Sequence, residues 1–359
     1  MYKIMTPGPT QVAENVRNAR ARECTNPDLD MAFYDYYKET CELISHLLHT
    51  DNETLILSGE GILGLEAACA SLTEHGDRVL VLDNGEYGRG FQDFVKIYGG
   101  EPVLYTTDYE EEIDVADLEE YLKNDHAFKY ATVVHCDTPS GRLNDISKIC
   151  PLLKQYGILT VVDSVSAMFG EYVNVDDFKI DLLCGGSQKA VSAPPGLTFV
   201  TLSDDVKKAV RGRKTPVASF YCNLAVFEGY YEKQWFPYTM PISDIYGLRE
   251  ALENIKSDTG MLERHKRLAQ KVRNTLRENG IALYGKSGFS NTVTAFMVPE
   301  GITDREILCT LKEKYRIMLA GSFGQFAGKL VRIGHMGENA TEENVDEVLR
   351  AILEIVKKR

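Results

Sequence analysis

The chain alternates between amphipathic stretches and short runs that are apolar throughout. Apolar residues recur at helical spacing over 33–48 and 62–72, and helices are also predicted over 88–98 and 145–156. The continuous apolar or β-branched runs predict strands over 54–57, 78–82, 130–135, 158–162, 181–184 and 197–202. Such runs, separated by helices, are typical of a parallel sheet that is covered on both faces, so the pattern predicts the α/β fold class.

The pattern changes in the last third of the chain. A long charged helix is predicted over 244–279, with Gly260 as its weak point. Strands over 291–297 and 330–333 and helices over 304–313 and 341–358 are predicted to follow. This second series indicates a smaller α+β domain.

The beginning of the chain has a different character. Pro7, Gly8 and Pro9 predict an extended arm rather than a helix or a buried strand. We therefore expect an N-terminal arm (residues 1–15), a large domain (16–256) and a small C-terminal domain (257–359). The length of 359 residues is sufficient for two or three domains.

Composition excludes several classes of protein. Hydrophobic residues make up 44% of the chain and charged residues 26%, which is the balance of a globular protein. The net charge of −13 argues against nucleic acid as the main partner. No apolar stretch approaches the ~18–20 residues of a membrane helix, and the N-terminus lacks the layout of a signal peptide. Eight irregularly spaced cysteines, none in a CxxC pair, predict reduced thiols in a cytoplasmic protein without a zinc site.

In a parallel sheet, ligands bind at the carboxyl ends of the strands, so the residues that follow each strand are the candidates for chemistry. The loop 58–64 contains GxGxxG between a predicted strand and a predicted helix, where backbone N–H groups can bind a phosphate. Asp83 ends the next strand, as a ribose-binding acid does in a dinucleotide site. A glycine-rich turn that only allows close packing is the other interpretation, and this loop alone does not choose a cofactor.

Two further strand ends carry chemically informative residues. Asp163 follows the strand 158–162, where a carboxylate could cap a helix, pair with an arginine, bind a metal or hold a protonated ring nitrogen. Lys189 follows an apolar run and a double glycine. Burial there would lower the pKa of its amine and make it a nucleophile able to form a Schiff base, although an ordinary solvated lysine is the simpler alternative.

His135, Cys136 and Asp137 form the cluster that most resembles a metal site. Neighbours on a strand face opposite sides, so the three cannot converge on one ion, and His135 is better interpreted as a core histidine. Thr138 offers a hydroxyl in the turn that follows. Tyr87 could lie flat against a planar cofactor or simply cover the core.

Taken together, these loops closely resemble those of the class V aminotransferase family, fold-type I enzymes that use pyridoxal phosphate (PLP). The resemblance is strongest to the alanine–glyoxylate and serine–glyoxylate aminotransferase branch. It implies a mostly parallel seven-stranded sheet between helices and a smaller α+β C-terminal domain. The matching stretches are TPGPT at 6–10, the loop and helix 59–68, NGEYG at 84–88, VDSV at 162–165, GSQKA at 186–190, APPG at 193–196, IYGLRE at 245–250 and VRIG at 331–334.

The resemblance also implies a role for each matching residue. Lys189 would form the Schiff base, Asp163 would hold the pyridinium nitrogen, and Arg332 would bind the substrate's α-carboxylate. Tyr87 would stack on one face of the cofactor ring and Val165 would touch the opposite face. The remaining contacts would come from the hydroxyl of Thr138, from a phosphate cradle made by the N–H groups of Gly61, Ile62 and Leu63 with Gln188, and from Thr239 of a neighbouring subunit. The last contact implies a homodimer.

The implied reaction moves an amino group from alanine or serine to glyoxylate or pyruvate by a ping-pong mechanism. Some positions depart from the family's pattern. Glu60 stands in the phosphate loop, where we expect it to point away, Phe236 replaces a phosphate-binding tyrosine, and Arg142 is a spare cation. The loop 135–138 is closer to that of 2-aminoethylphosphonate–pyruvate aminotransferases, so this activity is the alternative within the family.

Readings from other classes are also open. A nucleotide-binding oxidoreductase would use the loop 59–64 and Asp83, but it would leave Asp163 and Lys189 without a purpose. A catalytically idle interaction protein would not need the full set of catalytic positions. A cysteine desulfurase needs a mobile nucleophilic cysteine, and the sequence does not point to one.

Overall fold

The computed structural model describes residues 2–357. Its helices are α1 (Glu14–Arg20), α2 (Met31–Leu47), α3 (Gly61–Leu72), α4 (Glu86–Ile97), α5 (Val115–Asn124), α6 (Ile146–Gln155), α7 (Asp204–Arg211), α8 (Ile242–Ser257), α9 (Met261–Glu278), α10 (Asp304–Thr310) and α11 (Glu342–Lys357). Its strands are β1 (Lys3–Ile4), β2 (Glu53–Ser58), β3 (Arg78–Asp83), β4 (Glu101–Thr106), β5 (Tyr130–Val134), β6 (Cys136–Asp137), β7 (Arg142–Leu143), β8 (Leu159–Asp163), β9 (Leu182–Gly186), β10 (Leu197–Leu202), β11 (Val293–Met297), β12 (Ile317–Met318), β13 (Ala320–Gly321) and β14 (Leu330–Gly334).

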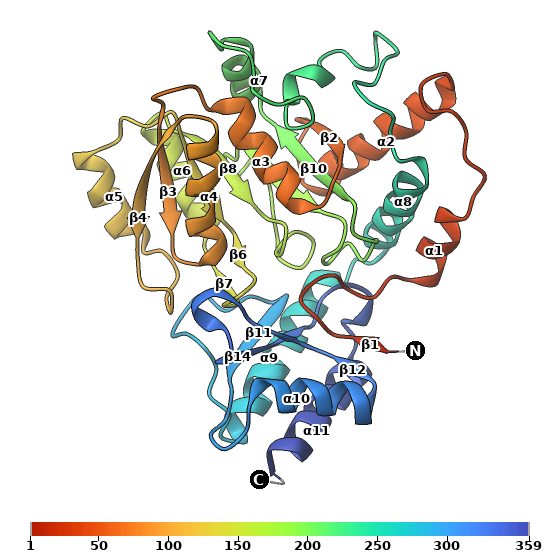
Figure 1. Ribbon diagram of the computed structural model, residues 1–359, viewed down its shortest axis with the longest axis vertical. Helices are drawn as coiled ribbons and strands as arrows, with labels where there is room; N and C mark the ends of the chain where they lie inside the picture. Colours follow the sequence, from red (N-terminus) through yellow and green to blue (C-terminus); the bar gives the residue numbers. More distant parts are fainter. Residues whose placement is uncertain (1, 358–359) are drawn as a thin grey trace.

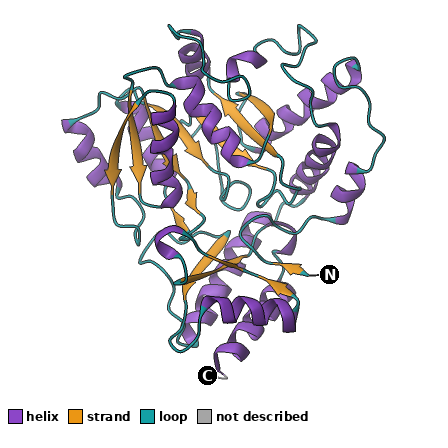
Figure 2. Ribbon diagram, viewed as in Figure 1, coloured by secondary structure: helices purple, strands orange, loops and turns teal. Residues whose placement is uncertain are grey.

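A seven-stranded sheet organises the larger part of the molecule, with the strand order β2-β10-β9-β8-β5-β3-β4. Strand β10 runs antiparallel to both of its neighbours, and the pairs β9–β8, β8–β5, β5–β3 and β3–β4 are parallel. Every residue of β5, β9 and β10 is buried, as expected for apolar strands that are covered on both faces. Figure 2 shows the helices that surround these strands. The predicted α/β class and mostly parallel sheet are confirmed.

The C-terminal segment forms a smaller unit, coloured blue in Figure 1, beside which both ends of the drawn chain lie. Its antiparallel sheet has the order β11-β14-β13, and α9 and α11 contact each other. Strand β1 pairs in parallel with β12, so residues 3–4 belong to a short sheet rather than to a free extended arm. Residue 1 of the predicted arm and residue 358 of the predicted last helix lie outside the described residues, as does residue 359.

The prediction of one continuous helix over 244–279 is wrong, because the chain forms two helices there. Helix α8 ends at Ser257 and α9 begins at Met261, directly after Gly260. Asp258, at the break, accepts hydrogen bonds from the guanidinium of Arg264 in α9. Glycine disfavours a continuous helix, and the bonded Asp258 stabilises the bend.

Two large clusters of buried apolar side chains form most of the core, and a small third one consists of Ala295, Phe326 and Leu330. The larger surrounds the seven-stranded sheet, and the second, which includes Leu268, Phe296 and Ile352, lies between the small sheet and its helices. Met5 joins this second cluster and is fully buried, so the N-terminal segment is part of the packing. Within residues 2–357, no helix has the length and apolar character required to cross a membrane.

Candidate functional site

A cavity of about 240 Å³ lies at the carboxyl ends of β2, β8 and β9. Loops that are far apart in the sequence meet here because the strands that they follow are neighbours in one sheet. The candidate residues that line it are Gly61, Ile62, Tyr87, Thr138, Asp163, Val165, Gln188 and Lys189, and the rest of the lining is Gly8, Pro9, Glu60, Leu65, Ser166 and Pro195.

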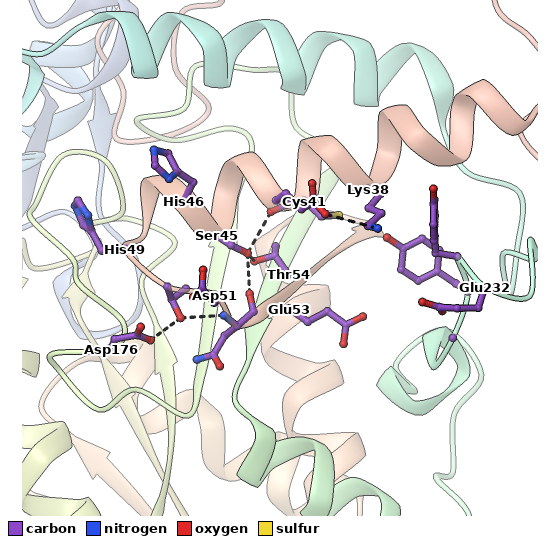
Figure 3. Close-up of a pocket in the computed structure, with 16 residues that line it drawn as sticks. Lys38, Cys41, Ser45, His46, His49, Asp51, Glu53, Thr54, Asp176 and Glu232 are labelled. Atoms are coloured by element: carbon purple, nitrogen blue, oxygen red, sulfur yellow. Dashed lines mark hydrogen bonds and ion pairs between the residues drawn. The ribbon is translucent and has the colours of Figure 1, made fainter.

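A larger cavity of about 720 Å³ lies elsewhere, between α2, the start of β2 and residues 229–232 (Figure 3). Its polar groups already bond to one another. The Ser45 hydroxyl bonds to that of Thr54 at 2.8 Å, and Thr50 donates to Asp176 at 2.5 Å. The cavity faces the end at which β2 begins, where parallel sheets do not place their ligands. We therefore assign the chemistry to the smaller cavity.

Lys189 lies in the short loop that joins β9 to antiparallel β10. Its Nζ donates a hydrogen bond to the carbonyl oxygen of Pro7 at 2.6 Å. The pKa of the Lys189 amine is lowered to about 8. Burial is the main cause, and the positive charge of Arg332 is the second. A larger fraction of this amine is therefore neutral near pH 7 than for an exposed lysine, and the neutral form is the nucleophile.

Asp163 ends β8, next to the strand that precedes Lys189. It is 6% exposed, and its Oδ1 accepts the N–H of Val165 at 2.9 Å. Burial raises the pKa of Asp163 to about 6, against the opposing effects of this bond and of Lys189. Within residues 2–357, no arginine forms an ion pair with it, so the carboxylate has a charge to share with a bound cation.

Tyr87 lies in the first turn of α4, and its position depends on a residue to which the sequence did not assign this role. Its N–H donates to Oδ1 of Asp137 at 3.0 Å, and the other carboxylate oxygen accepts the hydroxyl of Ser140 at 2.6 Å. Asp137 is fully buried, and burial raises its pKa to about 6. The Tyr87 ring also contacts that of Phe323 edge-on, with 6.0 Å between the centroids.

Glu60 does not point away from the loop, contrary to expectation. It precedes α3 and lines the cavity, and its Oε1 accepts the N–H of Ile62 at 3.3 Å. Its Oε2 accepts Nε2 of Gln188 at 3.1 Å. The N–H of Leu63 donates to the backbone carbonyl of Glu60 at 2.8 Å, and Leu63 is not part of the lining.

Arg332 and Thr239 lie outside the cavity lining. Arg332, on β14, is 8% exposed and donates to the carbonyl oxygens of Gly321 at 2.8 Å and Thr138 at 3.2 Å. Its contact with Thr138 places it beside the cavity wall. Thr239 donates to Asp28 at 3.2 Å.

The two other departures from the family's pattern are accounted for by packing. Arg142 is 1% exposed, lies over the ring of Phe289 at 4.4 Å and donates to the carbonyl oxygen of Tyr284 at 2.9 Å. It is therefore not a spare cation at the cavity. Phe236 is stacked on Tyr34, with 4.4 Å between the ring centroids.

The side chains that a dinucleotide site or a metal site would require are engaged elsewhere in the structure. The carboxylate of Asp83 is fully buried and accepts hydrogen bonds from Arg89 at 3.1 Å, Thr106 at 2.9 Å and Tyr109. These bonds leave it poorly placed for a ribose. His135 is buried and bonded to the Ser164 hydroxyl at 3.0 Å, as a core histidine. Within residues 2–357, no three His, Cys, Asp or Glu side chains come together as a metal site.

Comparison with known proteins gives a consistent result. The sequence profile of the family "Aminotransferase class-V" matches residues 6–348. An uncharacterized aminotransferase of Methanocaldococcus jannaschii is 36% identical over 341 residues, or 93% of this chain and 87% of that protein. Pyridoxamine–pyruvate transaminase of Mesorhizobium japonicum is 31% identical, covering 94% and 86%. Alanine–glyoxylate aminotransferase of Callithrix jacchus is also 31% identical, covering 99% and 87%.

Among solved structures, ureidoglycine–glyoxylate aminotransferase of Bacillus subtilis superposes with a TM-score of 0.95 at 29% identity, covering 100% of this chain and 93% of that one. Both the sequence match and the fold therefore extend over nearly the whole chain. The chain belongs to the class V aminotransferases, as an enzyme of the alanine–glyoxylate type in a family that depends on pyridoxal phosphate.

Proposed function

We propose that this enzyme moves the amino group of a small amino acid, alanine or serine, to a small 2-oxo acid, glyoxylate or pyruvate, by a ping-pong mechanism. The observation that carries the proposal is the presence in one cavity of an amine with a lowered pKa, Lys189, and a buried carboxylate, Asp163, presented by neighbouring strands.

The residues around one end of the cavity fit the pyridine ring of pyridoxal phosphate. Lys189 supplies the amine that would hold its aldehyde carbon, and Asp163 supplies an anion for a protonated ring nitrogen. Tyr87 and Val165 supply surfaces for the two faces of a flat ring. Gly61 has no room for a side chain, because a Cβ there would lie 2.9 Å from Val165. A planar group with a cationic nitrogen is therefore well matched to this part of the site.

When bound, pyridoxal phosphate supplies an electron-accepting ring that stabilises negative charge at the substrate's α-carbon. Residues of the chain itself move the proton and orient the substrate. With its amine free, Lys189 would take the α-proton of the substrate and later return it, which a pKa of about 8 suits. Asp163 keeps the ring nitrogen positively charged, and Arg332 orients the α-carboxylate through its planar guanidinium.

The assembly proposed with this function is a homodimer in which Thr239 reaches the phosphate of the partner's site. Thr239 does not line its own chain's cavity, and large exposed apolar side chains precede it in the sequence: Phe220 is 56% exposed and Trp235 52%. Leu29, next to the bonded Asp28, is 79% exposed. Such a concentration of exposed apolar groups supports a covered surface.

The other parts of the proposal concern the chain's organisation and location. We propose an N-terminal segment 1–15, a large domain 16–256 and a small domain 257–359. The first core cluster draws mostly on the large domain and the second mostly on the small domain, which supports the division between these two. We also propose that the enzyme acts in the cytoplasm, which the free thiols of its cysteines support.

A second candidate function is transfer from pyridoxamine to pyruvate, the activity named for the Mesorhizobium relative. The position of Glu60 favours it, because this carboxylate holds groups that would otherwise bind a phosphate. In that reaction the unphosphorylated vitamer is a substrate.

The test of the proposed function combines a substrate screen with one variant. Alanine, serine, 2-aminoethylphosphonate and pyridoxamine are offered as amino donors, and glyoxylate and pyruvate as acceptors, with both products measured by mass spectrometry. Lys189→Ala should lose transfer and the covalent attachment of the cofactor that borohydride fixes to the wild-type protein. Attachment that persists in Lys189→Ala would refute the role of this lysine, and turnover of 2-aminoethylphosphonate alone would select the alternative within the family.

A further inference from the structure

The phosphate end of the proposed site is already occupied by a side chain of the protein itself. The donors that the family's pattern assigns to a phosphate are the N–H groups of Gly61, Ile62 and Leu63 and the amide of Gln188. The carboxylate of Glu60 accepts from Ile62 at 3.3 Å and from Gln188 at 3.1 Å. Leu63 donates to the backbone carbonyl of the same residue at 2.8 Å. Glu60 therefore takes up most of the hydrogen bonds that a phosphate would need.

The charges around this end of the cavity also disfavour a phosphate. Within the described residues, Glu60 forms no ion pair, although its negative charge acts through space on the Lys189 amine and raises the pKa of that amine. Lys189 is the one cation in the described lining, and its amine is directed to Pro7. A phosphate at the start of α3 would meet a carboxylate in place of the lysine or arginine that usually accompanies phosphate sites.

An uncharged hydroxyl suits the same groups better. A hydroxyl can donate to a carboxylate, whereas a fully ionised phosphate ester has only acceptors. Oε1 of Gln188 is buried, and no described residue donates to it. Since Nε2 of the same amide is committed to Glu60, this oxygen is a second acceptor that a hydroxyl could satisfy.

We propose that Glu60 is a specificity-determining residue that makes the site discriminate against a 5′-phosphate and in favour of the 5′-hydroxyl of unphosphorylated vitamin B6 compounds. This inference rests on the proposed orientation of the cofactor, with its phosphate end at α3. It identifies the substrate class of the second candidate function and assigns the selectivity to one carboxylate.

The test uses two ligands that cannot react. Pyridoxine and pyridoxine 5′-phosphate carry an alcohol in place of the aldehyde, so they neither bond to Lys189 nor transfer an amino group. Their dissociation constants are measured by calorimetry for the wild type, Glu60→Gln and Glu60→Ser. Asp114→Asn is the matched control, since Asp114 caps α5 through the N–H groups of Ala116 and Asp117 and does not line the cavity.

Glu60→Gln removes the charge and keeps an oxygen able to cap α3, so it should fold as the wild type does. Glu60→Ser gives a second, shorter uncharged residue in case the amide perturbs the loop. Removing a like charge close to the phosphate should shift the ratio of the two dissociation constants toward the phosphate ester by about tenfold or more in either variant. Asp114→Asn should leave this ratio unchanged.

A shift of less than about tenfold in both variants would overturn the proposal. That result would mean that Glu60 rotates out of the cavity when a phosphate arrives, at the cost of one helix cap. Because neither ligand can undergo transfer, this outcome is independent of whether the enzyme acts on alanine, serine or pyridoxamine. Conversely, absence of transfer with every donor would leave the affinity ratio, and therefore this inference, intact.

Discussion

The amine of Lys189 and the backbone carbonyl of Pro7 lie 2.6 Å apart, joined by a hydrogen bond across a sequence separation of 182 residues. Pro7 follows strand β1, which pairs with β12 in the C-terminal part of the chain. The N-terminal segment therefore connects the proposed nucleophile to the smaller unit of the fold. Disturbance of this segment should change the chemistry of the lysine without touching the lysine itself.

Gly8→Ala tests this connection. A Cβ on Gly8 would lie 2.4 Å from Cδ and 2.8 Å from Nζ of Lys189. The backbone at Gly8 has φ = +101°, which alanine adopts only with strain, so a loss of about 1–2 kcal/mol in unfolding free energy is also expected. The rate at which borohydride fixes the cofactor to the protein should fall by about tenfold or more, since the amine is displaced.

Gly76→Ala is the matched control for that variant. Gly76 also has a positive φ, +81°, but a Cβ there would meet nothing within 4 Å. It should show a similar loss of stability, measured by denaturant unfolding, and an unchanged rate of cofactor attachment. Equal attachment rates in the two variants would show that the N-terminal segment does not position Lys189.

Arg332→Gln should weaken binding of both amino and oxo acids. The arginine is held by the carbonyl oxygens of Gly321 and Thr138, so its charge is fixed at the wall of the cavity. Loss of a buried charge-assisted contact to the substrate carboxylate should reduce kcat/KM by about 100-fold, mainly through KM. Arg267→Gln, at an exposed arginine paired with Glu342, should leave the kinetics unchanged.

The same substitution should change the titration of Lys189. Arg332 is one cause of the lowered pKa of Lys189, so removing its positive charge should move that pKa upward from about 8. The pH dependence of lysine acylation in the ligand-free protein, followed by mass spectrometry of the peptide, reports this shift. An unchanged midpoint together with an unchanged KM would place Arg332 outside the site.

Asp163→Asn should change the pKa of Lys189 in the opposite direction, that is, downward. The carboxylate of Asp163 raises the pKa of Lys189, so the amide should lower it below about 8 in the same acylation experiment. Asparagine keeps an oxygen that can accept from Val165, so the fold should be retained. Turnover should fall by about 10²–10⁴-fold, because the ring nitrogen would lose its anion. Full activity in this variant would refute the proposed contact with the ring.

Asp137→Asn should reveal a pH-dependent contribution to stability. Burial raises the pKa of Asp137 from its ordinary value of 3.8 to about 6, so the folded state retains a proton that the unfolded chain releases between these values. The stabilisation from this site is fully present below its ordinary pKa and is lost as the pH rises through about 6. The wild type minus variant difference in unfolding free energy should therefore fall by about 2–3 kcal/mol between pH 4 and pH 7. If urea unfolding gave the same wild type minus variant difference in unfolding free energy at both pH values, this prediction would be contradicted.

The fold class and much of the cavity lining followed from the sequence, because both depend on local pattern. Continuous apolar runs such as 158–162 are recognisable one strand at a time, and parallel strands bring their carboxyl ends to one edge whatever their order. The direction of β10 was not recognisable, since an apolar run does not tell which way it travels. Strand β4 was missed because it is an edge strand with intermediate burial and begins Glu101-Pro102.

Contacts between distant residues account for most of what the sequence did not reveal. Asp137 supports Tyr87 from 50 positions away, and nothing near either residue indicates the pairing. The orientation of the Arg142 side chain depends on its contacts with Phe289 and Tyr284, which come from the C-terminal part of the chain. For Glu60 the departure from the family's residue was visible, but its orientation required the amide of Gln188 to be placed.

The loop between β9 and β10 limits how Lys189 can move. Both of its ends belong to a pair of hydrogen-bonded strands inside the sheet, with Gly186 opposite Thr198, and the loop closes on itself through Ser187, which bonds to Pro194 at 2.6 Å and to Ala193 at 2.9 Å. The backbone beneath the lysine is thus clamped on two sides. Travel of the amine between its bonding partners must come from rotation about the side-chain bonds alone, so one flexible four-carbon tether has to span every position that the reaction visits.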